Sequence, residues 1–217
     1  LISFYWRNGN YDKAFGIYDA SLKIANSKYH KQYLREMVDR YRERKNYDRA
    51  LIALAELRKD DPLNTDLFRI VSEIYAEQGN YQAMVQHYRD GLQMVRDSKM
   101  SEDEKKQQIA LMRRGIIQAN LILKDYTAAS DQYIELLNRD AENEALLSEA
   151  AFFASRYGIS SRLFDYYSNT AAASPKDHRW PMLLGRLHLY SSNPEAAIEQ
   201  FRAAIAIRPE RVDLHQS

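Results

Sequence analysis

The chain repeats one pattern six times at nearly constant intervals. One residue marks each repeat just after a short turn such as Gly9-Asn10, and successive marks are 36, 34, 45, 34 and 34 residues apart. These anchors are Tyr11, Tyr47, Tyr81, Tyr126, Ser160 and Pro194. A period near 34 residues with helical apolar spacing is typical of stacked helix-turn-helix units, which bury their apolar faces against one another. The repeat therefore predicts an all-α array of helix pairs. It does not identify the ligand, because the surface residues of such an array determine what it binds.

Positions counted from each anchor indicate how the helices of a pair would pack. Three residues on, four repeats have a small residue that allows close approach: Ala14, Ala50, Ala129 and Ala197. Seven residues on, every repeat has one bulky side chain on the same helical face: Tyr18, Leu54, Tyr88, Tyr133, Tyr167 and Phe201. Fifteen residues on, three repeats have a proline that ends the second helix: Pro62, Pro175 and Pro209.

This pattern resembles the tetratricopeptide repeat (TPR) family, which places Leu-Gly on the first helix, Ala-x3-Phe on the second and Pro after it. The last repeat matches with Leu184-Gly185, Ala197, Phe201 and Pro209. The resemblance covers essentially the whole chain. It implies a right-handed α-solenoid of about six TPR-like antiparallel helix pairs, with first helices inside, second helices outside and partial repeats at both ends. Where the family has Gly on the first helix or Ala on the second, several repeats of this chain have another residue, and we expect a wider separation of their two helices. These residues are Val38, Ser72, Ile117 and Ala151 on first helices, and Met84 and Leu163 on second helices.

The constant register predicts a single solenoid over residues 1–217, with one irregular interval. Between Tyr81 and Tyr126 there are 11 residues more than the usual 34. Ser101 followed by Glu104 is a capping-box pattern, and residues 102–104 are acids that favour a helix N-terminus. We therefore expect an extended first helix in the fourth repeat, at about residues 101–123. The insertion at residues 98–108 either only lengthens that helix or forms a prong that contacts a partner.

The two ends of the sequence favour a fragment of a longer protein. Residue 1 is Leu and not Met, residues 1–8 supply only the back half of a first helix, and residues 210–217 resemble the opening of another. Solenoids normally finish with atypical capping repeats. We therefore expect further repeats or domains on both sides.

Composition narrows the function classes. The net charge of +1 speaks against a protein held on nucleic acid by bulk electrostatics, and no apolar run approaches the roughly 18 residues of a membrane span. The chain has no Cys, so disulfides, thiol catalysis and thiolate metal sites are excluded. Its 5 His are scattered and form no HExxH pattern. We expect no enzyme activity, metal or cofactor within these residues.

The resemblance implies a partner-binding groove lined by first-helix residues 12 and 8 positions before each anchor. In the charged N-terminal part these are Arg35, Asp39, Arg69 and Glu73, followed by Arg114 and Gln118. Apolar residues would line the middle of the groove: Leu111, Leu121, Ile122 and Phe152. The arginines are either solvated helix surface or contacts for an acidic ligand, and Phe152 faces either the groove or the core. Because Arg114 and Arg186 have no acid at the paired position, we expect them to meet acidic ligand groups.

Two function classes fit these observations, and fold alone does not separate them. One is a non-catalytic protein–protein interaction scaffold that binds a peptide or protein segment in the concave groove. The alternative is a structural array that assembles a bacterial envelope or polysaccharide-export system. A nucleic-acid-binding helical repeat fits less well, because the groove carries acids such as Asp39 and Glu73. The lack of Cys favours a bacterial protein of the cytoplasm or periplasm; the partner and the oligomeric state stay open.

Overall fold

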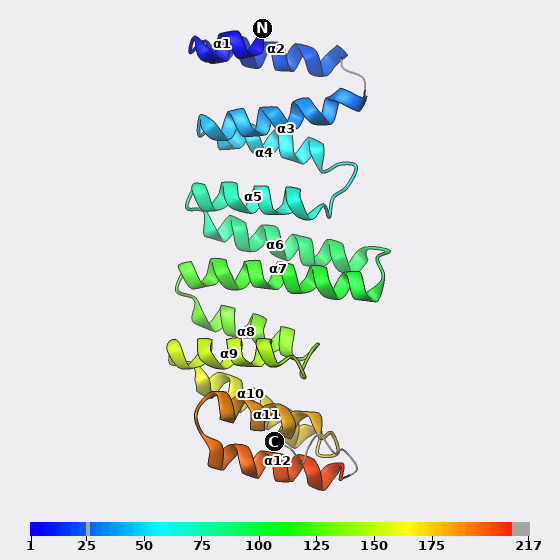
Figure 1. Cartoon of the computed structure of the whole chain (residues 1–217), viewed down its shortest axis with the longest axis vertical. Coiled ribbons are helices and arrows are strands. Elements are labelled where there is room, and N and C mark those ends of the chain that lie inside the picture. Colours follow the sequence, from blue (N-terminus) through cyan, green and yellow to red (C-terminus); the bar gives the residue numbers. More distant parts are fainter. Residues whose placement is uncertain (25–26, 210–217) are drawn as a thin grey trace. The chain divides into compact units, whose positions relative to one another are not determined.

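The computed structural model describes residues 1–24 and 27–209, and within these ranges it consists of twelve helices and no strand. Within each part of the chain, successive helices run in opposite directions (Figure 1). The helices are α1 (Ile2–Arg7), α2 (Tyr11–Ile24), α3 (Ser27–Glu43), α4 (Tyr47–Leu57), α5 (Thr65–Glu77), α6 (Tyr81–Asp97), α7 (Glu102–Ile122), α8 (Tyr126–Leu137), α9 (Glu144–Arg156), α10 (Ser160–Ala173), α11 (Arg179–Tyr190) and α12 (Pro194–Ile207). The predicted all-α array of antiparallel helix pairs is confirmed for the described residues.

Each anchor residue is the first residue of a second helix, and the turn before it explains why. Four of these helices are capped by Asn or Asp, whose side-chain oxygen accepts from the backbone N–H three residues on: Asn46, Asn80, Asp125 and Asn193. Such a cap satisfies one of the free N–H groups at a helix start. The residue before the cap lies in the left-handed region, as in Gly79 with a φ of 68°. Glycine adopts this conformation without strain.

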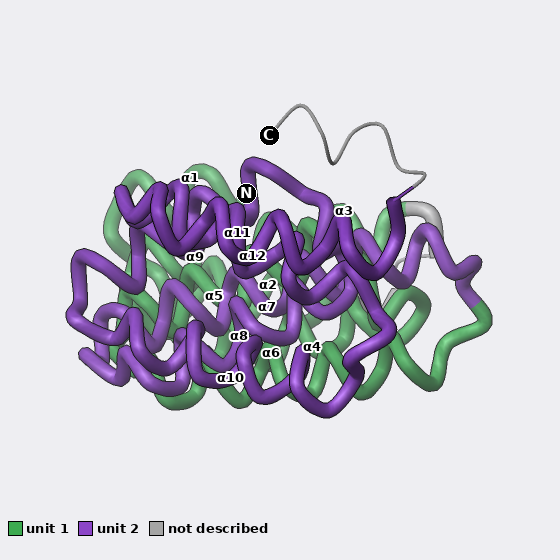
Figure 2. The backbone as a smooth tube through the Cα atoms, turned by 90° about the horizontal axis from the view of Figure 1, so that it is seen from below, with its two compact units in different colours: residues 1–99 green, residues 100–217 purple. Residues whose placement is uncertain are grey.

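The described chain divides into two compact units, residues 1–99 and residues 100–217 (Figure 2). Unit 1 holds α1 to α6, and unit 2 holds α7 to α12. Each unit has an apolar core formed between neighbouring helix pairs, as expected for a stack that buries its surface repeat by repeat. That the whole chain forms one continuous solenoid stays a prediction.

The bulky residues seven positions after the anchors form much of these cores. All six are buried: Tyr18, Leu54, Tyr88, Tyr133, Tyr167 and Phe201. The four alanines three positions after the anchors are completely buried too. Burying one such large side chain contributes about 1.5–3 kcal/mol relative to leaving it exposed. The predicted face of the second helices is therefore confirmed.

Helix pairs approach one another closely in three repeats and less closely in two. The close pairs are α3 with α4, α7 with α8 and α11 with α12; the open pairs are α5 with α6 and α9 with α10. The open pairs are those with Met84 and Leu163 in place of the second-helix alanine. Val38 and Ile117 lie in close pairs, so the expectation that a large first-helix residue widens the pair is wrong. In these five pairs the closeness of the two helices follows the residue at the second-helix position and not the one at the first-helix position.

The irregular interval contains the longest helix of the described chain, α7. Ser101 caps it, since its Oγ accepts from Glu104 N at 3.3 Å and Glu104 Oε2 accepts from Ser101 N at 2.9 Å. This is the reciprocal capping box. Relative to its anchor, α7 begins earlier than α3, α5, α9 or α11. Part of the extra length therefore extends the N-terminal end of this first helix. The second helix before it is also long, since α6 has 17 residues where α4 has 11 and α2 has 14.

Candidate functional site

The predicted groove residues of unit 1 border a pocket between α3, α4 and α5. The pocket has a volume of about 260 Å³. Its floor is apolar and consists of Val38, Leu54, Leu57, Leu67 and Ile70. Its rim carries two residues of each charge, Arg35 and Asp39 from α3 and Asp66 and Arg69 from α5. We call this the α3–α5 pocket. Three of the predicted residues, Arg35, Asp39 and Arg69, are thus brought together.

Most of the rim charges have no partner within the part of the chain that the structure describes. Arg35, Asp39 and Asp66 are exposed and form no ion pair or side-chain hydrogen bond with a described residue. Arg69 donates to Glu73, one turn along the same helix. The spacing that allows intrahelical pairing is therefore used in α5 and not in α3. A ligand could pair with Arg35, Asp39 or Asp66 without breaking an existing contact.

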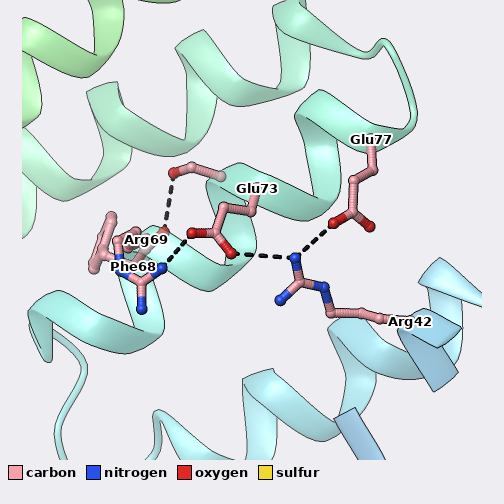
Figure 3. A network of polar contacts seen from close by, with 6 residues as sticks. Arg42, Phe68, Arg69, Glu73 and Glu77 are labelled. Atoms are coloured by element: carbon pink, nitrogen blue, oxygen red, sulfur yellow. Dashed lines mark hydrogen bonds and ion pairs between the residues drawn. The ribbon is translucent and has the colours of Figure 1, made fainter. Parts of the chain in front are cut away.

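A network of ion pairs joins α3 to α5 beside this pocket (Figure 3). Arg42 on α3 donates from Nη2 to Glu73 Oε2 at 3.1 Å and to Glu77 Oε1 at 2.6 Å. Glu73 therefore accepts from arginines of two helices, Arg42 and Arg69. The network joins the first helices of neighbouring repeats. It also uses the carboxylate of Glu73, which the sequence analysis predicted to line the groove.

In unit 2 the predicted groove residues lie mainly on the surface. Leu111, Gln118 and Ile122 are exposed on α7, and Leu121 is half-buried against the core of the unit. Phe152 on α9 is 65% exposed. Of the two orientations left open for Phe152, the structure therefore shows the outward one.

Arg114 and Arg186 have no acid at the paired position of their own helix, but each contacts an acid of another first helix. Arg114 Nη1 donates to both carboxylate oxygens of Glu149, at 2.8 and 2.9 Å. Arg186 Nε lies 3.3 Å from Glu144 Oε1. Both acids belong to α9, whereas Arg114 lies on α7 and Arg186 on α11. These arginines join neighbouring first helices, as Arg42 does in unit 1.

Tyrosine hydroxyls complete both of these contacts. Tyr133 Oη donates to Glu149 at 3.1 Å, and Tyr190 Oη donates to Glu144 at 2.6 Å. Burial, together with the nearby Glu149 carboxylate, raises the pKa of Tyr133. The hydroxyl therefore stays protonated and remains a donor. Each glutamate of α9 thus forms an ion pair with one arginine and accepts a hydrogen bond from one tyrosine.

Two buried polar side chains were missed by the sequence reasoning. His87 stacks on Phe68 with ring centres 4.3 Å apart, and its Nε2 lies 3.2 Å from the Phe68 carbonyl oxygen. Burial, with a smaller effect of the Arg58 charge, lowers the pKa of His87 to about 4. Arg113 is 4% exposed and donates to Gln132 and Glu135. Both side chains are fixed by contacts with a neighbouring helix, and no local sequence motif indicates these contacts.

The described residues hold no cluster of three His, Asp or Glu side chains that could bind a metal ion. In the same part of the chain, every helix is too short or too polar to cross a membrane.

Several solved structures are similar to this chain at low sequence identity. MamA from Desulfovibrio magneticus RS-1 is 13% identical, with 84% of this chain and 97% of that chain covered and a TM-score of 0.41. YrrB, described as a TPR protein with an unusual peptide-binding site, is 12% identical, with 92% and 96% covered and a TM-score of 0.39. A tetratricopeptide repeat protein from Parabacteroides merdae ATCC 43184 is 16% identical, with 100% and 79% covered and a TM-score of 0.40. No curated protein sequence matches the chain.

The family assignment rests on the sequence itself. The family model described as "Tetratricopeptide repeat" matches residues 35–98 and 165–214, which together are just over half of the chain. Proteins of this family are generally non-catalytic scaffolds for protein interactions. The matched regions include the anchors Tyr47, Tyr81 and Pro194, which begin second helices in the structure. The chain belongs to the tetratricopeptide repeat family.

Proposed function

We propose that the chain is a non-catalytic interaction module that binds a peptide or protein segment on its first helices, with the α3–α5 pocket as the main site in unit 1. The observation that carries this proposal is the combination of an apolar floor with unpaired charges on the rim. Binding sites typically join an apolar surface to a few polar groups that fix orientation.

The ligand is a segment with one apolar side chain between charged neighbours. The apolar side chain lies against Leu57 and Leu67, and an acidic neighbour pairs with Arg35. A basic neighbour pairs with Asp39 or Asp66. Because these three rim residues are exposed and unpaired among the described residues, the ligand gains their interactions without displacing an internal partner.

The same reasoning moves the proposed site away from Arg114 and Arg186. A ligand carboxylate at either arginine would compete with Glu149 or Glu144, which are already in place. Phe152 remains part of the proposal as an apolar contact in unit 2, since its ring is largely exposed. Exposed aromatic side chains often contribute strongly to interfaces.

Selection from a displayed peptide library, with the whole chain as bait, tests the proposal. We expect enriched peptides to share an apolar residue with charged neighbours. Their affinity, measured by fluorescence anisotropy, should fall about tenfold or more in Arg35→Glu and in Asp39→Arg, because each change places repulsion in the binding site.

Arg89→Glu is the matched control, because Arg89 is an exposed residue of α6 with no ion pair to a described residue. The control should bind the enriched peptides normally, and all three variants should melt like the wild type. Failure to enrich any peptide, or equal binding by Arg35→Glu, Asp39→Arg and the wild type, would count against the α3–α5 pocket.

A further inference from the structure

Unit 2 contains a second pocket built on the same pair of leucines as the α3–α5 pocket. Leu57 and Leu136 each follow an anchor by ten residues, and Leu67 and Leu146 each precede an anchor by fourteen. Each pair lies in the wall of its pocket. The other adjoining repeats lack this pair, with Ser21 and Tyr33, Gly91 and Met112, and Thr170 and Trp180 at the same positions. The two pockets thus share one pair of leucines at equivalent positions of two repeats.

The second pocket lies between α7, the end of α8 and the start of α9, and we call it the α7–α9 socket. Ile109, Ala110, Leu136 and Leu146 form its apolar part. Its volume is about 70 Å³. One ordered water needs about 10–15 Å³ by this measure, so the socket has room for a small apolar group. Lys106 and Ile109 come from the first two turns of α7, which have no counterpart in α9 because α9 begins closer to its own anchor. The extension of α7 therefore forms one wall.

The rim of the socket differs in charge from that of the α3–α5 pocket. It carries three cations, Lys106, Arg114 and Arg139, and one acid, Asp140. Asp140 is already engaged, since it lies 3.4 Å from Lys106 Nζ and accepts from Asn143 Nδ2 at 3.1 Å. Arg114 is paired with Glu149. Arg139 is exposed, and its guanidinium has no partner in residues 1–24 and 27–209. The socket therefore offers net positive charge beside an apolar surface.

We propose that the α7–α9 socket binds an acidic segment of a partner protein, with one apolar side chain against Leu136 and Leu146 and a carboxylate on Arg139. This inference rests on the proposed function and adds a second site with its own charge preference. Arg139 supplies a charge-assisted hydrogen bond to the carboxylate. The neutralised Asp140 does not repel the ligand as a free acid would. A basic segment would instead be repelled by Arg139, which is unpaired among the described residues.

Synthetic fluorescein-labelled peptides test the preference on the whole chain. One peptide has a central leucine flanked by aspartate and glutamate, a second has lysine flanks, and a third has acidic flanks with glycine at the centre. We expect only the first to bind, with an affinity that falls as salt rises, because its contacts include exposed charges. Equal binding of the leucine and glycine peptides, or stronger binding of the lysine peptide, would overturn the inference.

Charge reversal then locates the site. We expect Arg139→Glu to weaken binding of the acidic leucine peptide about tenfold or more, as for an attractive contact turned into a repulsive one. The control Arg202→Glu changes the same charge on α12, at an exposed residue without a described ion pair, and should leave affinity within about twofold. If Arg139→Glu and Arg202→Glu bind alike, the attraction is nonspecific and the socket is not the site.

The α3–α5 variants separate this inference from the proposed function. Arg35→Glu should leave binding of the acidic leucine peptide at the socket intact. If Arg35→Glu abolishes that binding and Arg139→Glu does not, the socket inference fails while the proposed function of the α3–α5 pocket is supported. If no peptide of the set binds, the inference fails, and the library selection still decides the proposed function.

Discussion

The ring of Phe201 lies directly over the backbone of Gly185. A Cβ atom added to Gly185 would be 2.5 Å from Cε1 of Phe201. Real side chains do not approach this closely, so the ring occupies the space that any other residue would need. This contact belongs to α11 and α12, one of the closely packed helix pairs.

Gly185→Ala should therefore destabilise the protein although alanine favours helices. The gain in helix propensity is about 1 kcal/mol, whereas forcing an extra methyl group into a packed site costs about 1–3 kcal/mol. Thermal melting followed by circular dichroism measures the outcome. Combining Gly185→Ala with Phe201→Leu should cost less than the two single changes added together, because the smaller side chain makes room. A rise in melting temperature for Gly185→Ala alone would show that the ring moves away freely.

Truncation of Tyr133 should be costly, and loss of its hydroxyl alone much less so. Tyr133 is 4% exposed and donates to Glu149. We expect Tyr133→Ala to cost about 3–5 kcal/mol in the free energy of unfolding, and Tyr133→Phe about 1 kcal/mol. Urea denaturation distinguishes the two. Tyr88→Ala, also at a buried position, should resemble Tyr133→Ala; a loss below about 1 kcal/mol at both sites would contradict their place in the core.

Acid should destabilise the protein partly through His87. Its pKa is lowered to about 4 in the folded state, against 6.5 for an ordinary histidine. Between these values the unfolded chain binds a proton that the folded chain does not, so stability falls as pH drops from about 6.5 towards 4. The full effect on the free energy of unfolding is roughly 3 kcal/mol. The stabilisation is complete above about pH 6.5, where the ring is neutral in both states.

His87→Gln removes this titration and keeps a donor for the Phe68 carbonyl oxygen. We expect urea denaturation at pH 7 and pH 5 to show a larger difference in the wild type than in the variant. Carboxylates contribute to both proteins alike, so the comparison isolates the histidine. An identical pH dependence would mean that the ring takes up a proton as readily in the folded protein as in the unfolded chain, contrary to its buried place between Phe68 and Tyr88.

Two surface changes in unit 2 should differ in their effect on stability. Arg114→Glu removes a contact to Glu149 and sets a second acid beside it, so we expect a loss of about 1 kcal/mol, which is reduced by salt. Phe152→Ala removes an exposed ring and should change stability by less than about 0.5 kcal/mol. Melting temperatures of both variants at low and high salt give the comparison. A stable Arg114→Glu protein would indicate that Glu149 finds another partner.

The repeat made the helices predictable, because each anchor combines a local turn with a local helix start. Leu54 and Tyr133 could be placed in the core from spacing alone, since burial on one helix face follows the helical period. The partners of Arg42 and Arg114 could not, because they depend on how one first helix is offset against the next. Both arginines have an acid 35 residues further on, Glu77 and Glu149. An acid one repeat after an arginine is the signal that such a pair leaves in the sequence, but the signal does not give the offset of the two helices.

The residues of the pockets could also be predicted only in part from the sequence. The leucines of the α3–α5 pocket were assigned to no site, although three of its rim residues, Arg35, Asp39 and Arg69, were. The sequence shows which residues recur at a position, but a pocket requires the distance between three helices. His87 is the clearest miss, since one histidine on a helix gives no sign of whether an aromatic ring from the neighbouring helix covers it.

The alternation of close and open helix pairs makes the chain mechanically uneven. A load applied to a series of packed elements deforms the softest joints first. Among the helix pairs within single repeats, α5 with α6 and α9 with α10 are the least closely packed, whereas α3 with α4, α7 with α8 and α11 with α12 are the most closely packed. Met84 and Leu163 stand at the second-helix position of these two pairs, so replacing either with alanine tests whether a closer approach of the helices stiffens that repeat.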